Sequence, residues 1–127
     1  MKNKQVVYHK ENVVLSQCLE YLKVNKIYCW RNSVGCAKIG NRFMRFGLKG
    51  SSDILGILPN GQFLAVECKR EKGGRLSEEQ IEFINKINKN GGFAICVNSL
   101  YDLESKLYAH CKSFKQKCGQ EQTHESV

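Results

Sequence analysis

Three side chains able to bind a metal ion or a phosphate flank two apolar segments in the middle of the chain. Asp53 precedes the first segment, and Glu67 and Lys69 lie at the end of the second. The segments are joined by Pro59-Asn60-Gly61, which is typical of a hairpin turn because proline presets φ and Asn-Gly tolerates the left-handed region. A turn centred on its middle residue places Asp53 opposite Glu67. Lys69 then lies on the same strand face as Glu67, because side chains alternate along a strand.

This register brings two carboxylates together. It pairs Leu58 with Gln62, Ile57 with Phe63, and Leu55 with Ala65. Directly opposed residues on antiparallel strands have Cβ atoms roughly 5 Å apart, and like charges there destabilise the pair. A positive charge should therefore lie between Asp53 and Glu67, and with Lys69 they would form a site for a divalent cation and a phosphate. The simpler alternative is that the acids are solvated strand ends neutralised by lysine.

The segment after this hairpin predicts a helix and a buried strand. Ser77-Glu78-Glu79-Gln80 has the spacing of a capping box, in which Ser77 caps the helix and Gln80 reaches back. Ile81, Ile84 and Ile87 continue the helix, and Asn90-Gly91-Gly92 ends it. The apolar run 93–97 suits a buried strand, which a crossover helix would place parallel to the strand before it. Ser99 is expected to cap a last helix.

The first part of the chain predicts a helix over residues 10–24 and a strand over residues 27–32. Leu15, Cys18 and Leu22 recur at helical spacing, and Glu11 lies on the same apolar stripe. An inward-facing carboxylate needs a partner. Glu11 is therefore either an auxiliary ligand for a metal or its waters, or a first-turn acid favoured by the helix dipole.

Positive charge is concentrated in the first 50 residues, which hold ten Lys and Arg against two acids, whereas residues 51–127 hold ten of each sign. The excess favours a surface for a polyanion, with nucleic acid as the leading candidate. In the ambiguous stretch 36–49, read as a short strand plus a loop, Phe43 and Phe46 are predicted to be core residues rather than base-stacking ones. The predicted DNA contacts are Arg31, Arg42, Arg45, Lys49, Ser51, Ser52, Lys72 and Arg75.

Length and composition exclude several classes of protein. A chain of 127 residues fits one domain, which we place at residues 1–111, followed by a polar tail at 112–127 that we expect to be frayed. No apolar run is long enough to span a membrane and no signal-like block follows the first residues, so we expect a soluble cytoplasmic protein. Seven cysteines without a secretion signal favour reduced thiols over disulfides, and over a zinc cluster at His110, Cys111 and Cys118.

The order of these motifs resembles a known nuclease family. Gly50-Ser51-Ser52-Asp53, Glu67-Cys68-Lys69 and Ser77-Glu78-Glu79-Gln80 are similar to the signature of the PD-(D/E)XK superfamily, and more narrowly to its VRR-NUC type in the small, phage-like form. The similarity extends across residues 47–98 and, more loosely, to Glu11 and to Trp30-Arg31-Asn32. Ser52 stands where the family usually has proline.

The resemblance implies an α/β fold of the restriction-endonuclease type, with a mixed four-stranded sheet flanked by helices. It also implies a metal-dependent DNA endonuclease, often a homodimer, with relatives that cut Holliday junctions and flaps. We assign Asp53, Glu67 and the backbone carbonyl of Cys68 as ligands of Mg²⁺ or Mn²⁺. Lys69 would position water or steady the charge on the phosphate, and Glu11 and Gln80 would hold outer-shell waters. No small-molecule cofactor is expected.

Two alternatives from other classes remain open at this point. The chain would be a basic DNA-binding module with a vestigial nuclease site if Asp53, Glu67 and Lys69 did not bind metal. It would be a small regulatory or structural protein if the acids were merely paired with lysine. Metal titration tests the first alternative, and salt-sensitive DNA affinity counts against the second.

Overall fold

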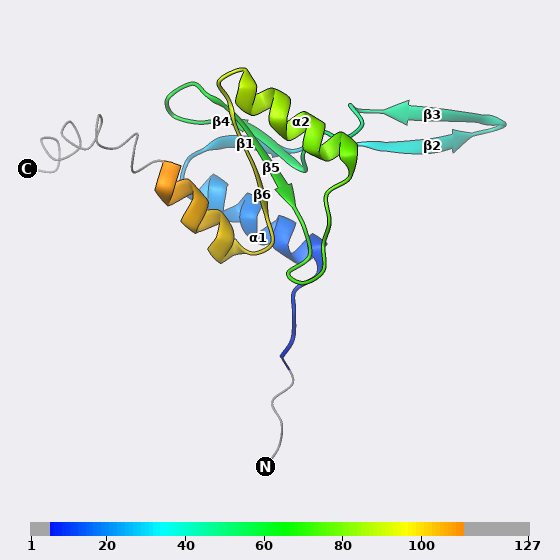
Figure 1. The fold of residues 1–127 in the computed structure, drawn as a ribbon. Helices are drawn as coiled ribbons and strands as arrows, with labels where there is room; N and C mark the ends of the chain where they lie inside the picture. The colour runs from blue at the N-terminus through cyan, green and yellow to red at the C-terminus, as the bar shows by residue number, and fades with distance from the viewer. Residues whose placement is uncertain (1–5, 111–127) are drawn as a thin grey trace, which may run out of the picture.

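The computed structural model describes residues 6–110. The elements are α1 (Glu11–Val24), β1 (Tyr28–Arg31), β2 (Gly35–Ile39), β3 (Arg42–Phe46), β4 (Ile54–Ile57), β5 (Phe63–Cys68), α2 (Glu78–Lys89) and β6 (Phe93–Val97), followed by helical residues 100–110 (Figure 1). The predicted tail at 112–127 and the cysteines Cys111 and Cys118 lie outside the described residues. Cys18, Cys29, Cys36, Cys68 and Cys96 are free thiols, as expected.

The main sheet is mixed. Its strand order is β1-β4-β5-β6, with β4 antiparallel to both β1 and β5 and β5 parallel to β6. Helix α2 lies in the connection between the two parallel strands, as such a connection requires. The predicted α/β fold with a mixed four-stranded sheet flanked by helices is therefore confirmed.

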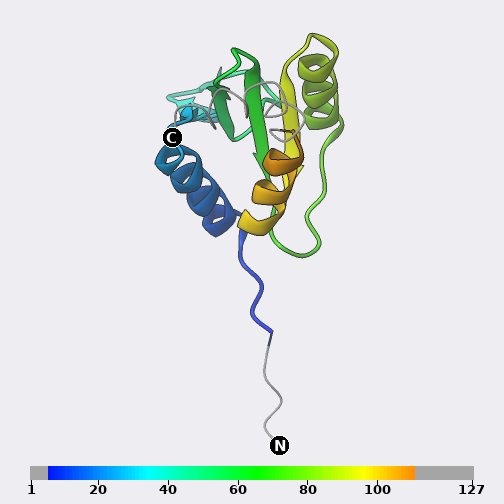
Figure 2. The same ribbon diagram turned by 90° about the vertical axis from the view of Figure 1, so that its left-hand side faces the viewer.

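Helices cover the sheet unequally. Figure 2 shows α1 and residues 100–110 on one side of the sheet and α2 on the other. The apolar core lies on the α1 side and is formed by Val14, Leu15, Cys18, Leu22, Cys29, Ile54, Leu58, Leu64, Val66, Cys68, Val97, Leu103 and Leu107. Helix α2 has no buried residue, although Ala65 and Glu67 of β5 are buried. Glu67 lies on the α2 side of the sheet, where its carboxylate accepts a hydrogen bond from Gln80.

The hairpin between β4 and β5 has the predicted register. Ile57 lies opposite Phe63 and Leu55 opposite Ala65. The turn closes with a hydrogen bond from the Gly61 amide to the Leu58 carbonyl (2.8 Å), and Gly61 has φ +89°, a left-handed conformation that glycine adopts without a Cβ clash. The turn therefore fixes which side chains meet at the far end of the hairpin.

The stretch 36–49 differs from the prediction. It forms a complete antiparallel hairpin, β2–β3, with Ile39 opposite Arg42 next to the turn, and this hairpin projects from the main body (Figure 1). Phe43 is 74% exposed and Phe46 48% exposed, so their prediction as core residues is wrong. The reason is that, within residues 6–110, no second layer packs on the projecting arm.

Residues 6–110 contain no helix that combines the length and the apolar character of a membrane span.

Candidate functional site

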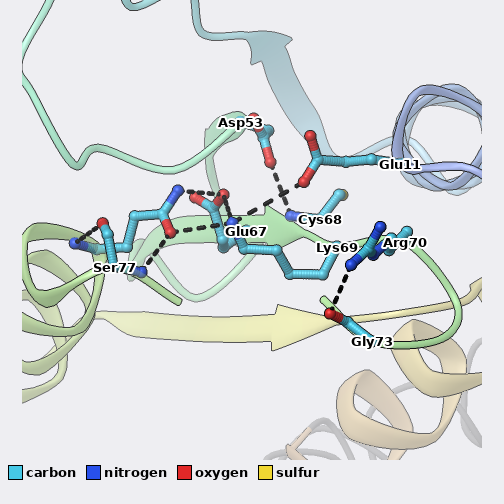
Figure 3. Close-up of polar contacts among 9 residues, drawn as sticks. Glu11, Asp53, Glu67, Cys68, Lys69, Arg70, Gly73 and Ser77 are labelled. Carbon is cyan, nitrogen blue, oxygen red and sulfur yellow. Dashed lines mark hydrogen bonds and ion pairs between the residues drawn. The ribbon is translucent and has the colours of Figure 1, made fainter. Parts of the chain in front are cut away.

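Two carboxyl groups meet at the end of the β4–β5 hairpin. Asp53 directly precedes Ile54, which pairs with Val66, so the next step of the ladder brings Asp53 beside Glu67 (Figure 3). One oxygen of Asp53 accepts a hydrogen bond from the Cys68 amide (2.8 Å), and the Asp53 and Glu67 carboxyl groups are close enough for Asp53 to raise the pKa of Glu67. The predicted meeting of the two acids is present in the structure.

The electrostatics of Glu67 are unusual. Glu67 is only 2% exposed, and its pKa is raised to about 8, first by burial and then by the charge of Asp53 and the hydrogen bond with it. Lys69 acts in the opposite direction but does not cancel these effects, and Glu11 adds to them. Without a further positive charge, Glu67 therefore holds a proton at neutral pH.

Lys69 is held by oxygen atoms from three elements. Its Nζ lies 3.6 Å from Glu67 Oε1 and 3.9 Å from Glu11 Oε1, and it donates to Gln80 Oε1 at 3.0 Å. The Lys69 backbone amide donates to the Val97 carbonyl (2.9 Å), which extends the pairing of β5 and β6. The amine is thus placed at the site by the backbone and by its neighbours.

Gln80 has both of the roles that its position allows. As the capping-box residue, its Oε1 accepts from the Ser77 amide (2.9 Å), while its own amide donates to Ser77 Oγ. The same Oε1 accepts from Lys69, and Nε2 donates to Glu67 Oε1 at 2.9 Å. One carboxamide therefore stabilises the start of α2 and orients two residues of the site.

The donor set fits a hard divalent cation. Within residues 6–110, no three His, Cys, Asp or Glu side chains form a metal-binding group, so the two carboxylates need another ligand. Residues in a strand direct both backbone groups toward the same neighbour. Because the Cys68 amide donates to Asp53, the Cys68 carbonyl also faces the Asp53 side. Two carboxylates and a carbonyl, completed by water and phosphate, match the preference of Mg²⁺.

Glu11 lies beside this donor set rather than inside the core. It is the first residue of α1, and its side chain is 55% exposed, so the expected inward orientation on the apolar stripe is wrong. Figure 3 shows its carboxylate directed toward Asp53 and Lys69. The helix start places Glu11 at the rim, where Lys69 is the partner that its charge requires.

Two recesses are lined by residues of this site. The first, about 510 Å³, is lined by Arg31 and Ser51 together with Asp53 and Gln80. The second, about 640 Å³, is lined by Arg75 with Lys10, Glu11, Lys69, Arg70, Gly73 and Gly74. The structure thus brings Arg31, Ser51 and Arg75 of the predicted DNA contacts close to the catalytic candidates.

The other five predicted DNA contacts do not line these two recesses. Arg42 and Arg45 are on the projecting hairpin. Lys49 pairs with Glu79 (3.2 Å), and the Lys72 amine lies 5.1 Å from the centre of the Tyr8 ring. Ser52 is 1% exposed, and its hydroxyl has no hydrogen-bond partner in the described structure. A buried hydroxyl has no access to DNA, so a contact from Ser52 would have to come from its backbone and not from its side chain.

Sequence reasoning gave no site role to Asn32, Lys10 or Arg70. Asn32 donates to Ser51 Oγ (2.7 Å) and to the Ser52 carbonyl (3.0 Å), which fixes the loop before Asp53. Lys10 and Arg70 line the second recess. For Lys10 and Arg70 the available signal was adjacency in sequence, because Lys10 precedes Glu11 and Arg70 follows Lys69. For Asn32 it was the looser family resemblance at Trp30-Arg31-Asn32.

Comparison with known families agrees with this geometry. Residues 10–100 match the family model of the VRR-NUC domain. A search of curated proteins finds no match to the chain. The matched segment covers most of the chain and contains Glu11, the acid pair, Lys69 and Gln80. The chain therefore belongs to the VRR-NUC domain family, a nuclease-type domain of the PD-(D/E)XK class.

Proposed function

We propose that this protein is a Mg²⁺- or Mn²⁺-dependent endonuclease that hydrolyses phosphodiester bonds in branched or structured DNA, such as four-way junctions. Membership of the VRR-NUC family supports nuclease action on DNA. The observation that carries the metal dependence is the state of the acid pair. The Lys69 ammonium lies 3.6 Å from Glu67, yet the pKa of Glu67 is still raised to about 8. The single positive charge of one ammonium group does not balance two ionised carboxylates. A divalent cation would supply the remaining positive charge.

Each residue has a distinct role in this proposal. Asp53, Glu67 and the Cys68 carbonyl would hold the metal ion. When bound, a divalent cation supplies positive charge to the phosphate oxygens and acidifies a water molecule. Lys69 would place its ammonium against the phosphate and stabilise the charge that develops during attack. Gln80 keeps Lys69 and Glu67 in position through its two hydrogen bonds.

Charge supports DNA as the partner. No acid occurs between Glu20 and Asp53, whereas this stretch contains seven Lys and Arg residues. Arg31 and Ser51 line one recess beside the acids and Arg75 the other, so a strand crossing the site would meet partners for its phosphates on both sides. Glu11 would hold an outer-shell water at the rim.

We also propose a homodimer, because two sites facing two symmetric strands suit a junction. An exposed apolar patch on the edge of the sheet supports this. Tyr28 and Trp30 of β1 are exposed, with ring centres 5.7 Å apart, and exposed Ile57 pairs with Tyr28. If the patch forms the dimer, Trp30→Glu lowers the mass measured by light scattering to that of one chain. An unchanged mass places the interface elsewhere or excludes the dimer.

A cleavage panel tests the proposed activity. Duplex, nicked, flap and four-way DNA are incubated with Mg²⁺, with Mn²⁺ or with EDTA. Glu67→Ala and Lys69→Ala are expected to lower the cleavage rate by about 10²–10³-fold or more. Glu82→Ala and Lys86→Ala are matched controls, because this ion pair (2.9 Å) is exposed on α2. Cleavage in EDTA, or equal cleavage by all variants, would show a contaminating nuclease and a misassigned site.

Isothermal titration of Mn²⁺ into the protein separates the non-catalytic alternative from the enzyme. A vestigial site that cannot bind metal would give no heat that depends on Glu67, while DNA binding would persist. Binding heat that is lost in Glu67→Ala and kept in Glu82→Ala supports a functional metal site.

A further inference from the structure

We infer that the recess between the β2–β3 hairpin and α2 is a pocket for one unpaired nucleobase, next to the phosphate that is cut. This inference rests on the proposed function, because it assigns a substrate group to the same site. The pocket begins at Asp53 and Gln80 and extends to Phe46 at the base of the hairpin, with Arg31 and Asn32 between them. Its volume of about 510 Å³ lies in the range of pockets that enclose small organic groups.

Phe46 provides a flat apolar surface in this pocket. The ring is 48% exposed, although apolar rings normally gain stability from burial. It lies over Gly35, its cross-strand partner, where a Cβ would be 2.5 Å from the ring Cζ. The missing side chain at Gly35 therefore makes room for the ring in its present position. An aromatic ring that is held in place and open to solvent is a stacking surface for a base.

The pocket floor is fixed before any ligand binds. The Asn32 amide donates to the Asp53 carbonyl (2.7 Å), and the Asn32 side chain donates to Ser51 Oγ (2.7 Å). Ser51 Oγ in turn donates to the Leu48 carbonyl (2.6 Å). These bonds tie the loop that carries Asp53 to the end of β1. The part of the pocket formed by Asn32, Ser51 and Asp53 is therefore in place before a base binds, as positioning of a base beside the scissile phosphate requires.

The second recess has a different character. Among the described residues it is lined by the basic side chains of Lys10, Lys69, Arg70 and Arg75, by one acid, Glu11, and by glycine backbone, and no aromatic residue lines it. Such a surface suits phosphates and not bases. The two sides of the acid pair thus recognise different parts of a nucleotide. The strand would be held by its backbone on the Arg75 side and by a base on the Phe46 side.

A base inside a continuous duplex is stacked and paired, and extruding it costs free energy. An unpaired base beside a branch point or a mismatch has already lost most of this stabilisation. The pocket therefore favours DNA with an unpaired nucleotide at the cut position. The preference is expected to arise at Phe46, because stacking of one base on an aromatic side chain changes affinity by about 5- to 150-fold.

The test compares binding of two DNAs in EDTA, so that cleavage does not interfere. One is a continuous duplex, and the other is the same sequence with a single unpaired nucleotide, replaced by 2-aminopurine. Phe46→Leu keeps an apolar side chain over Gly35 but removes the stacking surface, and Phe46→Tyr keeps it. Phe43→Leu is the matched control, because Phe43 lies on the same strand and is more exposed but does not line the pocket.

For Phe46→Leu, we expect the affinity ratio of unpaired to paired DNA to fall at least fivefold, and the quenching of 2-aminopurine on binding to be lost. Phe46→Tyr and Phe43→Leu should keep the ratio within twofold. An equal ratio in Phe46→Leu and wild type, or an equal loss in Phe43→Leu, overturns the inference. A wild-type protein that binds DNA but cleaves none of the panel refutes the proposed nuclease instead, so the two failures are distinguishable.

Discussion

Replacing Glu67 by glutamine should make the metal-free protein more stable at high pH. Glutamine resembles the protonated acid, since it keeps an oxygen for Gln80 and has a donor for Asp53. In wild type the pKa of Glu67 is about 8, raised from 4.5 by burial and by Asp53. The native state therefore binds more protons than the unfolded state between these values. The contribution of Glu67 to the free energy of unfolding should be greatest below pH 4.5 and should fall as pH rises toward 8.

The magnitude follows from linkage. Between pH 4.5 and the native pKa of Glu67, each increase of one pH unit lowers the free energy of unfolding by about 1.4 kcal/mol. Between pH 6 and pH 9, the loss for a pKa of about 8 is about 3 kcal/mol. A domain of this size has only about 5–15 kcal/mol in total, so the effect is large. Glu67→Gln should lack this loss and become the more stable protein at pH 9.

Urea unfolding of EDTA-treated protein at pH 6, 7, 8 and 9 measures the effect. The quantity of interest is the difference between wild type and Glu67→Gln, because other titrating groups contribute to both. Glu82→Gln is the control for loss of a negative charge, since this exposed residue is paired with Lys86 on the surface of α2. Parallel stability curves for wild type and Glu67→Gln would refute the argument, because Glu67 would then be ionised throughout.

Three further predictions follow from the same contacts. Because metal must displace the proton of Glu67, the apparent association constant for Mn²⁺ should rise up to about tenfold per pH unit from pH 6 to the pKa of Glu67 near 8. An association constant from titration calorimetry that does not change with pH would contradict this. Gln80→Leu should lower the free energy of unfolding by about 1 kcal/mol through the lost cap, which a lower urea midpoint would show. It should also lower the cleavage rate by about 10–100-fold, which single-turnover kinetics would measure. Ser52→Ala should leave stability unchanged or raise it by about 1 kcal/mol, because it removes a buried hydroxyl without a partner, and a clear loss in urea unfolding would show that the hydroxyl is bonded.

The meeting of Asp53 and Glu67 was predictable because it follows from the number of residues between each acid and the hairpin turn. A three-residue turn with Pro and Gly fixes the register, and every later pair follows from it. The start of α2 was predictable for a similar reason, since the capping box specifies Ser77 and Gln80 within four residues. These features are local, and local sequence is sufficient to encode them.

The surroundings of the site were less predictable because they depend on packing at a distance. The pattern of Phe43 and Phe46 resembles a core strand, and only the absence of a covering layer makes them exposed. Helical spacing placed Glu11 on the apolar stripe, but its position at the helix end leaves it at the rim. The burial of Ser52 depends on the elements around it, which its small side chain does not reveal.

The double use of Gln80 has a consequence for how activity is acquired. Glu67 and Lys69 reach their places with β5, but the carboxamide that aligns them belongs to a helix formed later in the chain. A partly folded protein with an intact β4–β5 hairpin and an unwound first turn of α2 would have the acids and the amine without their common brace. In the proposed nuclease, the site would therefore be complete only when the first turn of α2 has formed.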